Sequence, residues 1–184
     1  ISPPTQPITF NTTEHELRKE HELPERLGHL HNHLGRMVVS GAFKNVLEQH
    51  HCEGLLYQNA IIIDMQGKRH ENYWVLNFTQ SRNVIDLGKS KYKNFGHGAI
   101  DMSTYALLSK HLGKKPLCER LFFEMGTDKT SVSKVAFHTD LIAELVAAGC
   151  TGIWSFRLDT YRSGQQYSPD MILNIKKIER NFYP

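Results

Sequence analysis

Residues 73–90, YWVLNFTQSRNVIDLGKS, decide the fold. The run Tyr73–Phe78 is rich in aromatic and branched residues, which fit a pleated, half-buried surface. The polar run Thr79–Asn83 is typical of a turn, and Val84–Leu87 begins a second apolar run. The pattern predicts a β-hairpin at the centre of a sheet. The small polar residues of this stretch are expected to bond nearby backbone groups or cap element ends: Asn77, Asp86 and Ser90.

Composition restricts the classes of protein to be considered. The chain has 184 residues, 40% of them hydrophobic, which suits one domain with a substantial core. The net charge of +3 gives no strong electrostatic footprint for nucleic acid. No stretch approaches the roughly 18 apolar residues of a membrane span.

Three widely spaced cysteines, Cys52, Cys118 and Cys150, favour a reducing compartment over a disulfide framework. The first residues lack the charged and apolar regions of a signal peptide. Both features favour a cytoplasmic location, although they do not exclude the periplasm.

The first 35 residues are predicted to form an extension. Three prolines in residues 1–12 favour an extended arm, and Thr13–Glu22 allows a short helix. We expect no contribution to the core before Leu27. Residues 36–184 are predicted to form a single α+β domain, with a mostly antiparallel sheet and helices packed on one side. An amphipathic C-terminal helix is expected from Ser168 onward.

Two segments, Met37–Tyr57 and Ala136–Phe156, share a strand–cap–helix–strand pattern. Ser40 and Thr139 are the predicted helix caps, and Gly149 suits the left-handed position after the second helix. The segments also align at matching positions: Cys52 with Cys150, Gly54 with Gly152, and Leu47 with Leu145. A degenerate internal repeat and convergence on one packing unit explain this equally well.

The β-rich middle of the chain is predicted from shorter signals. Ala60–Asp64 is expected to be a strand, followed by a turn at Gly67. Lys89–Gly98, KSKYKNFGHG, is interpreted as a basic and aromatic loop. Ile100–His111 is ambiguous, with a helix capped by Ser103 as one interpretation, and Leu117–Met125 is predicted to be a strand.

Several short motifs resemble the Imm11 immunity-protein family. They are YWVLN followed by VIDLGKS, the VVSGAF unit at residues 38–43, and the AAGCTGI ending at residues 147–153. The resemblance covers roughly residues 36–160. It implies a protein that binds a cognate bacterial toxin in a polymorphic toxin system of interbacterial competition, and neutralises it without catalysis. The toxin and its delivery route are not identified by the sequence, type VI secretion being one such route.

Two basic, aromatic segments are the expected contacts with this partner. Their residues match the types enriched at interface hot spots: Tyr92, Phe95 and His97, then Arg157, Tyr161 and Arg162. These residues follow from composition and not from the family resemblance.

Two alternative functions remain open. A metal-dependent enzyme would use the histidine-rich segments, His29–His33 and His50–His51. A nucleic-acid-binding module would use the basic, aromatic Lys89–Gly98 segment. The chain has no linear motif of a nucleotide-binding, hydrolase or zinc-protease site, so we predict no catalytic residue, metal or cofactor. The oligomeric state is left open.

Overall fold

The computed structural model describes residues 6–12, 19–20, 27–33, 36–52, 54–96, 99–127, 131–153, 155–158 and 160–163. These residues fold as two compact units. The first contains the described residues up to Thr79 and Ala143–Ile153, and the second contains those of Gln80–Ile142 and 155–163. The predicted α+β class is confirmed, with two parallel and five antiparallel strand pairs among the described residues. The predicted C-terminal helix lies outside the described residues.

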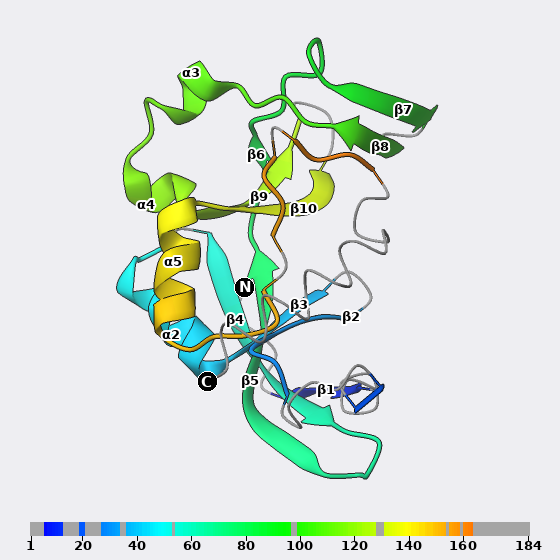
Figure 1. Cartoon of the computed structure of the whole chain (residues 1–184), viewed down its shortest axis with the longest axis vertical. Helices are drawn as coiled ribbons and strands as arrows, with labels where there is room; N and C mark the ends of the chain where they lie inside the picture. Colours follow the sequence, from blue (N-terminus) through cyan, green and yellow to red (C-terminus); the bar gives the residue numbers. More distant parts are fainter. Residues whose placement is uncertain are drawn as a thin grey trace. The chain divides into compact units, whose positions relative to one another are not determined.

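A five-stranded sheet forms the first unit (Figure 1). Its strands, in chain order, are β1 (Ile8–Asn11), β2 (Leu30–His33), β3 (Arg36–Ser40), β4 (Leu55–Ile63) and β5 (Arg69–Phe78). Their order across the sheet is β1-β4-β5-β3-β2, and only β1 pairs in parallel. Strand β5 therefore occupies the centre, as the aromatic run at Tyr73–Phe78 predicts. The expected strand Ala60–Asp64 is the second half of β4, and Gly67 has the predicted positive φ of 77°.

The predicted hairpin between Tyr73–Phe78 and Val84–Leu87 is wrong. Strand β5 already pairs with β3 along one edge and with β4 along the other. A strand has only two hydrogen-bonding edges, so no further partner can be added. The short strand β6 (Arg82–Asn83) pairs in parallel with β9 (Phe122–Gly126) instead. Val84 and Ile85, both nearly fully buried, belong to the core of the second unit.

Helix α2 (Gly41–Gln49) contacts β3 and β5 on one face of the first sheet. As predicted, Ser40 is its N-cap, because the Phe43 N–H donates to Ser40 Oγ over 3.3 Å. The buried face consists of Phe43, Val46 and Leu47, together with Gly41. The helix ends at Gln49, and His50 is its C-cap.

The expectation that the chain before Leu27 adds nothing to the core is wrong. Ile8 and Phe10 of β1 pack against a buried cluster on the sheet. The buried members of this cluster are Val38, Ala60, Ile62 and Val75. The prolines near the N-terminus do not prevent this packing, because Ile8–Asn11 contains none and pairs with Ala60–Ile63.

The second unit contains two smaller sheets (Figure 1). One has the order β10-β9-β6, and the other pairs β7 with β8. The remaining elements of this unit are β7 (Lys91–Gly96), β8 (Ala99–Thr104), α3 (Ser109–Leu112), α4 (Leu117–Arg120) and β10 (Ser131–Phe137). Its core is a cluster of the buried residues Val84, Ile85, Met102, Phe123 and Met125.

Further predictions for the chain after Thr79 need correction. The strand expected at Leu117–Met125 begins only at Phe122, because Leu117–Arg120 forms a helical turn directly after Pro116. The Lys89–Gly98 segment contains a strand, β7. Ser103 lies in β8 and caps no helix, and the helix expected after it, α3, begins only at Ser109. A strand was also expected at Ile153–Phe156, but its described residues form none.

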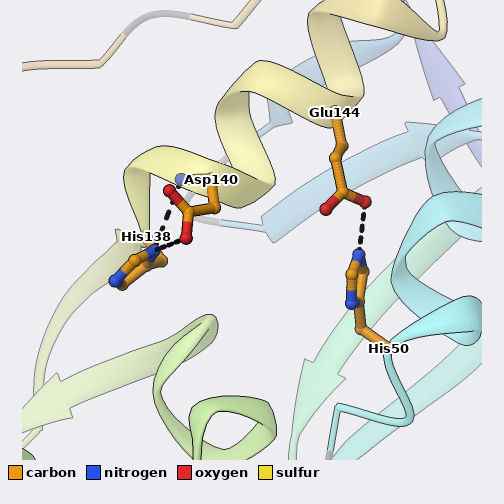
Figure 2. A network of polar contacts seen from close by, with 4 residues as sticks. All are labelled: His50, His138, Asp140 and Glu144. Atoms are coloured by element: carbon orange, nitrogen blue, oxygen red, sulfur yellow. Dashed lines mark hydrogen bonds and ion pairs between the residues drawn. The ribbon is translucent and has the colours of Figure 1, made fainter.

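Helix α5 (Thr139–Ala147) continues the chain from the second unit into the first. The Asp140 N–H donates to His138 Nδ1 over 3.3 Å, so His138 takes the capping role predicted for Thr139 (Figure 2). Within the first unit, His50 Nε2 lies 2.5 Å from Glu144 Oε2, which connects the end of α2 to α5 (Figure 2). Gly149 has the predicted left-handed conformation, with φ 74°.

Gly152 is a position where the backbone requires glycine. Its φ is 79°, and a Cβ there would lie 2.8 Å from the Leu30 carbonyl oxygen. We expect Gly152→Ala to lower the free energy of unfolding by roughly 2–4 kcal/mol, because strain and overlap add. Gly67→Ala is the matched control, since Gly67 has φ 77° and open space around it. It should cost only about 1–2 kcal/mol in urea unfolding. Equal losses of unfolding free energy in the two variants would contradict the steric overlap with the Leu30 carbonyl oxygen.

Asp64 gives the first unit a dependence on pH. His70 Nε2 lies 2.8 Å from Asp64 Oδ2, and the Gln66 and Lys68 N–H groups donate to Oδ1. The His70 contact first, and then the backbone donors, lower the pKa of Asp64 below its usual value. The stabilisation is therefore present above the unfolded-state pKa of about 3.9 and is lost as pH falls through the lower, folded-state pKa.

We expect Asp64→Asn to remove this dependence. The variant should be less stable than the parent chain at neutral pH, and the difference should shrink below about pH 4. Urea midpoints measured across this pH range would test the expectation. Midpoint curves that stay parallel for the two proteins would contradict it.

Candidate partner-binding site

The β7–β8 hairpin projects two aromatic side chains from a firmly held base. Asp86 N–H donates to the Ala106 carbonyl over 2.8 Å, and Ala106 N–H donates to Ser90 Oγ over 2.9 Å. Ser90 Oγ in turn donates to the Asp86 carbonyl over 2.7 Å. The prediction is confirmed for Ser90, whose side chain bonds nearby backbone groups. Asp86 contributes its backbone N–H and carbonyl here, and its side chain pairs with Lys89 instead. These bonds fix where β7 begins.

The two strands of the hairpin differ sharply in burial. Met102 of β8 is buried in the core of the second unit, and Ile100 packs against the same cluster. In β7, all six residues from Lys91 to Gly96 are exposed. Strand β8 therefore anchors the hairpin, while β7 presents its side chains to solvent.

Tyr92 and Phe95 are among the most exposed large apolar side chains of the described residues, at 42% and 59%. The Lys93 ammonium lies 4.9 Å from the centre of the Phe95 ring, a cation–π contact that favours one orientation of both side chains. Lys91 is also exposed on this strand. Strand β7 therefore exposes two lysines and two aromatic rings.

The second predicted segment lies beside β8. The Ser163 N–H donates to the Ser103 carbonyl over 3.1 Å, which places residues 160–163 along this strand (Figure 1). Tyr161 packs against Tyr105 and Phe156, with ring centroids 5.5 and 5.7 Å apart. Burial, and then the neighbouring Tyr161, raise the pKa of Tyr105 to about 12, so its ring stays uncharged at neutral pH.

The structure thus gathers most of the predicted contact residues in one unit. Tyr92 and Phe95 are exposed on β7, and Arg157 and Arg162 are exposed on the segment that follows α5. Tyr161 is part-buried in an aromatic cluster, which gives it a structural role. His97 lies outside the described residues.

The residues that hold this surface were not found from the sequence. Met102, Ser103 and Thr104 of β8 were assigned to an ambiguous segment. Ile100 and Met102 alternate with polar residues, which is the period of a half-buried strand and the signal that identifies β8.

The histidine-rich segments are used for local contacts. His31 Nε2 lies 2.9 Å from the Gly28 carbonyl oxygen, and His29 Nδ1 lies 2.7 Å from Ser40 Oγ. Within the part of the chain that the structure describes, no group of three or more His, Cys, Asp or Glu side chains is placed to hold a metal ion. Burial raises the pKa of the Cys150 thiol to about 11, so this cysteine is protonated and unreactive at neutral pH.

A comparison with family models decides the classification. The Imm11 immunity protein family model matches residues 4–156. The chain belongs to the Imm11 immunity protein family. Membership assigns it a role in toxin immunity, and the match begins well before residue 36, where the resemblance by motif starts. The matched Imm11 region includes the β7–β8 hairpin and ends just before Arg157.

A search of curated proteins gave no match. Among the described residues of this Imm11 chain, no helix is long and apolar enough to span a membrane.

Proposed function

We propose that this Imm11 chain binds a cognate bacterial toxin and neutralises it by covering the active site or the path of its substrate. The match to the immunity family over residues 4–156 carries the proposal. Inhibition of this kind requires a specific interface and no catalytic group on the inhibitor. The proposed setting is the cytoplasm of a bacterium that competes through polymorphic toxins.

The proposed contact surface is the exposed surface of the hairpin, defined as Lys91, Tyr92, Lys93 and Phe95 of β7, together with Arg157 and Arg162 of the segment that follows α5. Two features support this assignment. Aromatic and arginine side chains dominate the binding energy of most interfaces. Exposed basic groups accelerate association with an acidic partner. Tyr161 packs against Tyr105 and Phe156 and is given a structural role, and His97 remains a predicted contact.

Co-expression with the toxin domain encoded beside this gene tests the proposal. We expect growth to be restored and the two proteins to co-purify. Co-expression with an unrelated toxin domain is the control and should not restore growth. Restored growth without a complex would favour enzymatic reversal of the damage, and neither growth nor a complex would contradict an immunity role toward this toxin.

A further inference from the structure

Strand β7 has one hydrogen-bonding edge that no described strand occupies. It pairs with β8 alone, in a two-stranded sheet. All six of its residues are exposed, so side chains on both faces of the strand are accessible to a partner. An exposed edge of this kind is a template for another strand, and proteins usually protect it with short length, bulges or charge.

The backbone groups that point outward on β7 can be identified from its pairing. Lys91 N–H donates toward β8, to Thr104 Oγ1 over 3.0 Å. Successive residues of a strand direct their N–H groups to opposite edges. The register gives β8 an extra residue between Met102 and Thr104, and β7 an extra residue, Phe95, between Asn94 and Gly96, so the alternation along β7 is regular from Lys91 to Asn94. The N–H and C=O groups of Tyr92 and Asn94 therefore point to the open edge.

The charged residues of β7 favour one kind of partner strand at that edge. Lys91 and Lys93 are exposed, and the register places Asp101 of β8 opposite Lys93. Two copies of β7 paired edge to edge would bring their lysines together, and like charges on neighbouring strands are destabilising. A strand rich in Asp and Glu would be attracted by the same lysines.

We propose that β7 accepts an extended, acidic segment of the toxin as an added strand along its open edge. This inference rests on the proposed function and specifies how the partner binds. The added strand would bond to Tyr92 and Asn94 through its backbone, while its carboxylates face Lys91 and Lys93. Backbone pairing supplies affinity, and the side chains supply the choice of partner.

Amide hydrogen exchange on the full chain, with and without the neighbouring toxin domain, tests the added strand. We expect the Tyr92 and Asn94 amides to exchange rapidly in the free chain and at least ~10-fold more slowly in the complex. The Lys91 amide is an internal control, because it already donates to Thr104 Oγ1. A complex in which Tyr92 and Asn94 exchange as fast as before would overturn the inference and leave the proposed function standing.

Two further outcomes would also contradict the inference that a toxin segment adds to β7. Protection of these amides in the free chain that rises with its concentration would mean that β7 pairs with a second copy, which overturns the toxin as occupant. If the toxin domain neither binds nor is neutralised, the proposed function and the inference both fail.

Charge reversal tests the acidic character of the segment. Lys91→Glu with Lys93→Glu should weaken toxin binding by roughly 10–100-fold, mainly through slower association. Lys110→Glu with Lys114→Glu is the matched control, because these lysines are also exposed, lie in the same unit and change the net charge equally. Similar losses for both pairs, or none for the first, would overturn an acidic partner segment.

Discussion

Replacement of both Tyr92 and Phe95 by alanine is expected to abolish protection against the toxin. Interface hot spots contribute about 2–4 kcal/mol each, so the loss of two should weaken binding by at least ~1000-fold. The two rings are well suited to this role because they are 42% and 59% exposed on a strand held at its base. Calorimetric titration with the toxin domain, alongside the growth assay, would measure the effect.

This experiment has a close control in Leu117→Ala. Leu117 is 44% exposed and lies in the same unit, but on α4 instead of β7. Its removal should leave toxin affinity unchanged. The Tyr92 and Phe95 variant should also keep its urea midpoint, because exposed side chains usually contribute less than ~0.5 kcal/mol to stability. Full affinity in the double variant would exclude these rings from the interface.

Phe122→Ala should have the largest effect on stability. Phe122 is 1% exposed, and its ring packs against that of Phe137 with centroids 4.7 Å apart. Removal of such a ring leaves a cavity and costs about 3–5 kcal/mol. A loss of this size is a large share of the total stability of a typical domain.

Urea unfolding of Phe122→Ala beside Phe95→Ala would test this expectation. Both variants lose the same atoms, but Phe95 is 59% exposed and its removal should be nearly neutral. A Phe122 variant as stable as the Phe95 variant would contradict the burial of the Phe122 ring and its packing against Phe137.

Local signals in the sequence predicted local structure well. Ser40 caps α2, Gly149 takes the left-handed conformation after α5, and the aromatic run at Tyr73–Phe78 lies at the centre of its sheet. Each of these outcomes depends on the residue and its close neighbours. The Imm11 resemblance was confirmed as well, because the family model matches residues 4–156.

Pairing between distant strands could not be predicted in the same way. The run after Asn83 has the composition of a hairpin partner for β5, but both edges of β5 are taken by strands from elsewhere in the chain. Ile8 and Phe10 of β1 likewise join the core through pairing with β4, some fifty residues away. Composition reports what a strand can bury and not which strand lies beside it.

In the candidate site, too, local properties could be predicted and long-range contacts could not. Aromatic and basic composition indicated Tyr92 and Phe95 as exposed contacts, and both are exposed. Composition did not distinguish these two exposed rings from Tyr161, whose ring packs against Tyr105. That difference depends on contacts between segments more than fifty residues apart, which no local pattern encodes.

Titration of the purified toxin domain with this chain would test the central claim most directly. Residual toxin activity should fall in proportion to the amount of chain added, reach zero at a fixed molar ratio and stay constant with longer incubation. That result is expected of an inhibitor that acts by binding. Complete loss of activity at a small fraction of that ratio, progressing with time, would show catalytic inactivation and contradict the account.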